Sequence, residues 1–243
     1  MVVERIRMFR YSGIQAYTGC QQKYKFQYID NLEGDSSIDL EFGSALHKGI
    51  EAYFKLGDPM ATFNEYMDSI DPNLPKARFT QEQLCDMGAI FIERFIRLHA
   101  KKYDLKFIEK QMQFNILGHE FQGTADAIGL YEGVPSVIDF KSSGYRYDDR
   151  KILSNQQLIL YAHAAKETLN YKAEQVVYVV FIKSTTAPSI QVQKRPIIQS
   201  DIDKVLAEVD IVCKDIISKS ETGLYIKNKN NCGFCPYFER CIK

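Results

Sequence analysis

The sequence lacks a net charge and a long apolar run, and both absences exclude classes of protein. Its 31 lysines and arginines are balanced by 31 aspartates and glutamates, so no whole-molecule field attracts a polyanion and any nucleic-acid site must be local. The longest apolar run, residues 176–182, is far below the roughly 20 residues of a membrane helix. The opening ten residues lack the apolar core of a signal peptide. We therefore expect a cytoplasmic protein without membrane contact.

The charges cancel overall but are sorted along the chain. Residues 31–72 hold nine acidic side chains against two basic ones, and residues 111–140 hold four acidic side chains and no lysine or arginine. Residues 141–195 reverse this balance, with nine basic side chains against four acidic ones. Such an arrangement is expected where metal-binding carboxylates lie beside a phosphate-binding surface, although solvated helix faces cause similar imbalances more often.

The remaining composition is that of an ordinary globular protein. Apolar residues make up 45% of the chain and charged residues 26%, which excludes collagen-like, low-complexity and wholly disordered proteins. We find no internal repeat and no linker. The sequence therefore predicts a single domain over residues 1–243, with a mainly helical part (1–104), a catalytic sheet with its helix (105–199), and a C-terminal helix with a cysteine-rich tail (200–243).

Helical periodicity and capping signals dominate the first hundred residues. Ser12 followed by Gln15 is typical of a capping box, which predicts a first helix that runs towards Ile29 with a break at Gly19. Asp58 before Pro59, and Thr80 before Gln83, mark the starts of two later helices. The helices expected after the first one cover residues 42–54, 60–70 and 80–103.

The pattern then changes to the alternation of strands. Three strands are expected over residues 105–117, 121–130 and 136–141, joined by turns at Gly118-His119 and Glu132-Gly133 into an antiparallel meander. A helix over 152–169, a buried strand over 176–183, an edge strand over 190–197 and a helix over 200–219 complete the chain. The fold class is therefore mixed α/β, with a central mixed sheet flanked by helices.

The second turn of this meander brings two carboxylates together. If Glu132 and Gly133 are the two turn residues, Asp126 lies directly opposite Asp139, and Lys141 shares their face. Carboxylates so close repel one another, so a cation is expected there. Magnesium or manganese suits such oxygen ligands, binds a phosphate oxygen and lowers the pKa of its bound water.

A D-x-K tripeptide taken in isolation is more often a surface ion pair on an exposed strand. The apolar neighbours Val137, Ile138 and Phe140 argue against such exposure. Lys141 beside a metal ion could orient the attacking water or stabilise the negative charge that develops on phosphorus. The apolar neighbours thus weaken the ion-pair alternative, and both interpretations stay open at this point.

Around these residues the sequence resembles the PD-(D/E)XK nucleases, and among them the RecB-like exonuclease branch. Five elements occur in that family's order: Gly43 to His47 as G-x-x-x-H, Glu109 as an acidic residue on a preceding strand, Gly123 to Asp126 as G-x-x-D, Asp139 to Lys141 as D-x-K, and Gln157 with Tyr161 as Q-x-x-x-Y. The one departure is Ala125, which replaces a proline that is not a ligand.

This resemblance implies a restriction-endonuclease-like core and a role for each matched residue. The implied metal ligands are His47, Asp126, Asp139 and the carbonyl oxygen of Phe140, although a lone histidine beside an apolar stripe is more often a core residue. Lys141 would serve the attacking water, Gln157 and Tyr161 would position the DNA strand, and Glu109 would belong to the catalytic set. Arg146, Arg150 and Lys151, just past the site, are candidates for contacts with DNA phosphates.

Four of the six cysteines form a pattern typical of a metal site. Cys232, Cys235 and Cys241 form C-x-x-C-P-x-x-x-x-C, and the obvious fourth ligand, Cys20, lies 212 residues before Cys232. Four thiolates suit zinc or an iron-sulfur cluster. The layout resembles AddB-type and CRISPR-associated nucleases, in which one cysteine before the nuclease core and three after it hold a [4Fe-4S] cluster. A zinc site remains the alternative.

Together these features predict a metal-dependent deoxyribonuclease. We expect an exonuclease that acts on single-stranded DNA ends in recombination, repair, or phage or CRISPR-related DNA processing, with a helicase or recombination partner. Tyr11, Tyr24 and Tyr28 are candidates for stacking on bases, although core packing is the commoner role. The alternative is a non-catalytic DNA-binding subunit that uses the nuclease fold as a scaffold. The intact catalytic set argues against it, because a structural site gains nothing from crowded like charges.

Overall fold

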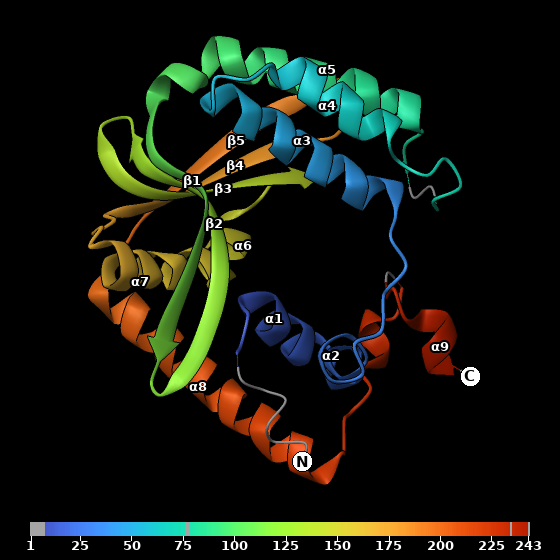
Figure 1. The fold of residues 1–243 in the computed structure, drawn as a ribbon, viewed down its shortest axis with the longest axis vertical. Coiled ribbons are helices and arrows are strands. Elements are labelled where there is room, and N and C mark those ends of the chain that lie inside the picture. The colour runs from blue at the N-terminus through green and yellow to red at the C-terminus, as the bar shows by residue number, and fades with distance from the viewer. Residues whose placement is uncertain (1–7, 76–77, 234, 243) are drawn as a thin grey trace.

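A five-stranded mixed sheet forms the centre of the protein (Figure 1). The computed structural model describes residues 8–75, 78–233 and 235–242. The strands are β1 (Tyr103–Ile116), β2 (His119–Tyr131), β3 (Val134–Ser143), β4 (Gln175–Ile182) and β5 (Ser189–Pro196), and they lie in this order across the sheet. β3 and β4 are parallel, and all other neighbours are antiparallel. The predicted fold class is confirmed.

Helices cover both faces of this sheet. They are α1 (Tyr11–Gly19), α2 (Gln21–Tyr24), α3 (Ile38–Phe54), α4 (Pro59–Asp68), α5 (Gln81–Leu98), α6 (Asp149–Ser154), α7 (Gln157–Leu169), α8 (Gln199–Thr222) and α9 (Phe238–Ile242). A π-helical segment (Lys25–Ile29) follows α2, and short 3₁₀ segments occupy Ala100–Lys102 and Lys229–Asn231. Figure 1 shows α3, α4 and α5 over one face, and α7 and α8 under the other.

The alternation of β4 divides the hydrophobic core into two layers. Val177, Val179 and Phe181 pack with the helices α3 to α5, whereas Val176 and Tyr178 pack with α1, α7 and α8. All of these side chains are fully buried, as expected for a strand covered on both faces. β5 forms the edge of the sheet, as predicted. It ends at Pro196, one residue before the predicted end, and the nitrogen of Pro196 cannot donate to a neighbouring strand.

Capping signals identified two helix starts correctly. Asp58 accepts hydrogen bonds from the backbone nitrogens of Met60 and Ala61, and Thr80 forms the predicted reciprocal capping box with Gln83. α3 begins at Ile38, four residues before the predicted start, because Ser37 caps it and accepts from the nitrogen of Leu40 at 3.4 Å. The periodicity alone did not reveal this first turn.

The first helix differs from the prediction. Arg10 occupies its cap position and makes no side-chain capping bond, so the capping box assigned to Ser12 and Gln15 is wrong. The break predicted at Gly19 is present, because Cys20 has an extended backbone and separates α1 from α2. Tyr11 and Tyr24 are buried in the core and are therefore not available to stack on bases.

The predicted helix over residues 152–169 is in fact two helices, α6 and α7. The side chain of Asn155 accepts from the nitrogen of Gln157 at 3.0 Å, which satisfies one of the free donors at the start of α7. Because of this break, Gln157 is the first residue of α7. Gln157 is one of the residues expected at the active site.

The β2–β3 hairpin has the predicted register. Tyr131 pairs with Val134 and Ala127 with Ile138, which leaves Glu132 and Gly133 as the two turn residues. Both have positive φ angles, 50° and 81°, as a type I′ turn requires. The β1–β2 turn is formed by Leu117 and Gly118, one residue earlier than predicted.

A segment near the start of the chain, residues 19–22, lies beside a segment near its end, residues 226–231, where the blue and red ribbons meet in Figure 1. The nitrogen of Gln22 donates to the carbonyl of Ile226 at 3.2 Å, and the side chain of Asn228 donates to the carbonyl of Gly19 at 2.9 Å.

Within the described residues, none of the helices has the length and hydropathy that a membrane-spanning helix needs.

Candidate active site

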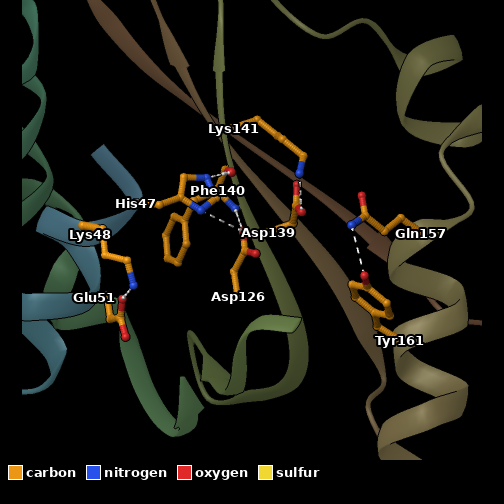
Figure 2. Close-up of polar contacts among 9 residues, drawn as sticks. All are labelled: His47, Lys48, Glu51, Asp126, Asp139, Phe140, Lys141, Gln157 and Tyr161. Atoms are coloured by element: carbon orange, nitrogen blue, oxygen red, sulfur yellow. Dashed lines mark hydrogen bonds and ion pairs between the residues drawn. The ribbon is translucent and has the colours of Figure 1, made fainter. Parts of the chain in front are cut away.

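The β2–β3 hairpin and α3 place an imidazole beside a half-buried carboxylate (Figure 2). Oδ2 of Asp126 accepts a hydrogen bond from the backbone nitrogen of Phe140 at 2.8 Å, and Nδ1 of His47 lies 3.7 Å from the same oxygen. The other ring nitrogen of His47, Nε2, contacts the carbonyl oxygen of Phe140. Three of the four predicted metal-binding groups therefore meet at one point.

The close approach of α3 to β3 depends on a glycine. A β-carbon at Gly43 would lie 3.2 Å from Oγ of Ser142, closer than most such contacts in proteins. Gly43 and His47 are one helical turn apart on α3, so the helix that approaches β3 at Gly43 presents His47 to the same strand. This contact gives the first motif glycine a packing role.

Glu109 joins this group through an unusual backbone conformation. It lies opposite Asp126, between the pairs Ile108–Ala127 and Lys110–Ala125 of β1 and β2, and its φ angle is 50°. His47, Glu109 and Asp126 each offer a ligand atom, and these atoms lie within 4.8 Å of one another. No other such group of histidine, cysteine or acidic residues occurs in the described residues.

Asp139 turns one oxygen to Lys141 and leaves the other without a partner. Its Oδ1 lies 2.8 Å from Nζ of Lys141, and its side chain is only 2% exposed. Its Oδ2 is buried and has no hydrogen-bond partner. Such orphaned polar atoms are rare and call for a cation or a water molecule. The oxygen and imidazole donors here therefore fit a hard divalent ion.

Burial and like charge shift the pKa values of the acidic groups upward. Burial raises the pKa of Asp126 well above its ordinary value, and the neighbouring carboxylate of Asp139 adds to this shift. The pKa of Glu109 is raised by burial and by the charge of Glu51. The pKa of His47 is lowered by burial and by the ammonium of Lys141, so its imidazole is neutral, as a metal ligand must be.

Lys141 remains protonated. Burial alone would lower the pKa of its ammonium, but the carboxylates of Asp139 and Asp126 outweigh burial and raise it above its ordinary value. A lysine held in its charged form cannot accept a proton from water near neutral pH. It can instead orient the water or stabilise negative charge in a transition state.

An open cleft of about 620 Å³ gives solvent access to this group. Its lining includes His47, Glu109 and Lys141, together with Ser142 and Lys183. Lys183 follows β4 and is buried, and it forms an ion pair with the half-buried Asp39 at the start of α3. Lys183 was not predicted as a site residue, although a lysine directly after a fully apolar strand could have indicated it.

The sequence model of the PD-(D/E)XK nuclease superfamily matches residues 9–242. The chain belongs to this superfamily. A crystal structure of a candidate exonuclease from Eubacterium rectale has the same fold, with a TM-score of 0.65 and 15% identity over 98% of this chain and 89% of that chain. The structure of SSO0001 is only distantly similar, with a TM-score of 0.36 and 15% identity over 84% of both chains. No protein with a curated description matches the chain.

The remaining elements of the nuclease motif lie on α7. Nε2 of Gln157 donates to the hydroxyl oxygen of Tyr161 at 3.4 Å, and Figure 2 shows this pair on the opposite side of Asp139 from His47. The ring of Tyr161 packs against Gly123, where a β-carbon would lie 2.6 Å from Cε1. The predicted site residues on α3, β1, β2, β3 and α7 thus converge in this member of the superfamily.

The predicted phosphate-binding residues lie beyond the end of β3. Arg146, Arg150 and Lys151 are all exposed, and Nζ of Lys151 lies 3.8 Å from the ring centroid of Tyr147. On the other side of the site, Figure 2 shows Lys48 paired with Glu51, at a distance of 2.8 Å.

Cys20, Cys232, Cys235 and Cys241 line one cavity of about 890 Å³ between residues 15–26 and residues 227–242. The nitrogen of Asn228 donates to Sγ of Cys20 at 3.4 Å, and Sγ of Cys232 donates to the carbonyl oxygen of Asn228 at 3.9 Å. In the described residues, no three of these sulfur atoms lie within 4.8 Å of one another. A tetrahedral zinc site would hold its sulfur atoms about 4 Å apart.

The remaining two cysteines differ from these four. Cys213 on α8 is fully buried. Cys85 on α5 is half-buried.

Proposed function

We propose that this protein is a divalent-metal-dependent deoxyribonuclease that acts as an exonuclease on single-stranded DNA ends. The observation that carries the proposal is the group formed by His47, Glu109 and Asp126 beside the Asp139–Lys141 pair, open to a cleft. Membership of the nuclease superfamily and the fold shared with a candidate exonuclease support it.

His47, Glu109, Asp126, the free oxygen of Asp139 and the carbonyl of Phe140 are the groups that would hold magnesium or manganese. When bound, such an ion supplies Lewis-acid polarisation of a phosphate oxygen and a lowered pKa of a water molecule. Lys141, held charged and fixed by Asp139, would orient the attacking water and stabilise the charge that builds up on the phosphate.

Gln157 and Tyr161 would position the DNA strand from the α7 side of the cleft. Their mutual hydrogen bond reduces the side-chain freedom that DNA binding would otherwise have to remove. Arg146, Arg150 and Lys151 would contact the phosphates of the strand beyond the scissile bond. The residues proposed to position DNA come from the superfamily motif, and those proposed to contact phosphates come from the charge pattern of the sequence.

For the cysteine cavity we propose a [4Fe-4S] cluster held by Cys20, Cys232, Cys235 and Cys241. All four cysteines line the same cavity, which supports one shared metal group. A cluster is proposed because one cysteine before the core and three after it resemble the layout of cluster-bearing nucleases. Such a cluster would join the two ends of the chain and so stabilise the fold. We further propose that the protein processes DNA ends together with a helicase or recombination partner.

A cleavage assay on end-labelled linear and circular single-stranded DNA tests the proposal. With magnesium or manganese, the wild type should shorten linear strands from an end and leave circles intact. EDTA should stop cleavage, and Lys141→Ala should reduce it to background while the fold remains unchanged. DNA that is bound by both proteins and cleaved by neither would identify a non-catalytic DNA-binding subunit. Cleavage of circles would identify an endonuclease.

A further inference from the structure

One aromatic side chain near the active site is unusually exposed. In the described residues every phenylalanine and tyrosine is buried or half-buried except Tyr145 and Phe238, and Tyr145 is 76% exposed against 41% for Phe238. Phe238 lines the cysteine cavity. Tyr145 follows Lys141 by four residues, in the loop between β3 and α6. Its exposure therefore occurs beside the catalytic strand.

The loop that carries Tyr145 is anchored on both sides of it. The side-chain oxygen of Ser143 accepts from the nitrogen of Tyr145 at 3.1 Å. The backbone of Tyr147 both donates to and accepts from the side-chain amide of Gln191, each bond at 2.9 Å, and Gln191 is only 7% exposed. A buried amide thus holds the loop while Tyr145 and Arg146 point into solvent. A ring presented by an anchored backbone loses little conformational entropy on binding.

A row of cations and rings connects Tyr145 with the catalytic cleft. Cζ of Arg78 lies 5.9 Å from the ring centroid of Tyr145 and 5.1 Å from that of Phe79. Nζ of Lys183 lies 5.8 Å from the same Phe79 ring, and Lys183 lines the cleft beside Lys141. Arg78 is the exposed cation of this row, because Lys183 is buried and paired with Asp39. Positive charge beside an exposed aromatic ring is the chemistry that single-stranded nucleic acid recognises.

We propose that Tyr145 stacks on a nucleobase of an unpaired DNA strand. The stacked base lies a few nucleotides away from the phosphate that is cleaved. This inference rests on the proposed nuclease function. In a duplex the faces of internal bases are covered by their neighbours, so an exposed ring can pack only on a base of a single strand or at a frayed end. Arg78 backs the ring, and Arg146 beside it neutralises an adjacent phosphate. Because every base has an aromatic face, the preference is for strandedness and not for sequence.

The test measures kcat and KM for cleavage of single-stranded oligonucleotides by the wild type, Tyr145→Ala and Tyr145→Phe. Tyr145→Ala should raise KM by about 5- to 150-fold with little change in kcat, and Tyr145→Phe should remain close to the wild type. The control is Leu98→Ala, which truncates another exposed apolar side chain, 56% exposed at the end of α5. It should leave both constants unchanged.

A second substrate series separates stacking from a general effect on the loop. A single abasic residue is moved along the oligonucleotide, one position at a time. At one position near the cleaved bond it should raise KM for the wild type as much as Tyr145→Ala does, and should not raise the KM of Tyr145→Ala further. A KM for Tyr145→Ala equal to that of the wild type, or additive losses at every position, would overturn the stacking role.

Failure of the nuclease proposal would be recognised separately. A wild type that cleaves no DNA with either metal would contradict the proposed function, and fluorescence anisotropy with the same oligonucleotides would then measure binding alone. Tighter binding of intact strands than of abasic strands, lost in Tyr145→Ala, would still support stacking. Equal binding of both strands by both proteins would exclude it.

Discussion

Gly123 and the ring of Tyr161 occupy adjoining space: a β-carbon at position 123 would lie 2.6 Å from Cε1 of the tyrosine. The glycine on β2 and the tyrosine on α7 belong to two different elements of the nuclease motif, and the contact explains why they occur together. Without a side chain at position 123, α7 can approach the sheet closely enough to bring Gln157 and Tyr161 to the site.

Gly123→Ala should therefore displace Tyr161 and reduce cleavage without removing any catalytic group. Forcing a methyl group into a packed contact costs about 1–3 kcal/mol of stability. Because the ring must move, the hydrogen bond between Gln157 and Tyr161 should be lost as well. Measurement of kcat on single-stranded DNA, with urea unfolding of the same protein, checks both effects.

A double-mutant cycle identifies the cause of this loss. If the clash with the ring is responsible, Gly123→Ala should cost markedly less stability when Tyr161 is already alanine. Tyr161→Phe, which keeps the ring but not the hydroxyl, should leave the cost unchanged. Equal costs in all three backgrounds would show that the glycine acts through the strand and not through Tyr161.

At position 109 a glycine variant should be more stable than an alanine variant, which reverses the order normal for a strand. The φ angle of 50° at Glu109 costs a residue with a side chain roughly 1–2 kcal/mol, and glycine adopts it freely. Glu109→Gly should therefore be about 1 kcal/mol more stable than Glu109→Ala, although glycine normally weakens a strand. Urea unfolding in EDTA measures this difference.

Both Glu109 variants should lose metal affinity to the same extent, because both lack the carboxylate. Calorimetric titration with manganese tests this point. A glycine variant less stable than the alanine variant would mean that the backbone at this position carries no strain. Retention of wild-type manganese affinity would remove Glu109 from the metal site.

The sheet could be predicted because its signals are local. Glu132-Gly133 is a two-residue turn of a type that fixes the hairpin register, and the apolar run from Val176 predicts a strand covered on both faces. The break of the first helix at Gly19 was predicted, but the start of this helix was not. Arg10 occupies the cap position without a side-chain capping bond, so no local capping signal marks the start.

The site could be predicted where its residues follow strand alternation. The placing of Asp126 opposite Asp139 required only the turn and the period of two. The position of Glu109 against His47 and Asp126 depends on a positive φ at a glutamate, which no propensity indicates. Tyr145 was missed because an exposed tyrosine is recognisable only once the burial of the other aromatic side chains is known.

The cysteine cavity makes a separate prediction about iron content. Cys20→Ser and Cys232→Ser should each remove the brown colour and the bound iron, and should lower the melting temperature by similar amounts, because either loss opens the same junction. The double variant should be no less stable than the single ones. Cys85→Ser on α5 is the matched control and should keep its iron. Stoichiometric zinc in a colourless wild type would contradict the cluster.

Asp126→Asn should separate function from stability. Burial and the charge of Asp139 raise the pKa of Asp126 above its ordinary value of 3.8, so the folded protein binds this proton more tightly than the unfolded chain. Stability in EDTA must then fall as the pH rises from the ordinary value to the raised one. Asparagine does not titrate, so the variant should be as stable as the wild type near pH 4 and more stable at pH 8.

Divalent metal should reverse this order, because a bound ion neutralises the charges that destabilise the wild type. Added magnesium or manganese should raise the free energy of unfolding of the wild type at pH 8 and should raise that of Asp126→Asn much less, since one charged ligand is gone. Chemical unfolding at pH 4 and pH 8, each with EDTA and with metal, gives four values for each protein. A variant that is less stable than the wild type in EDTA at pH 8 would show that Asp126 is a structural residue. A variant that gains as much stability from metal as the wild type would show that Asp126 is not a ligand. Greater stability without metal, together with lost activity, is the combination that a metal-binding carboxylate must produce.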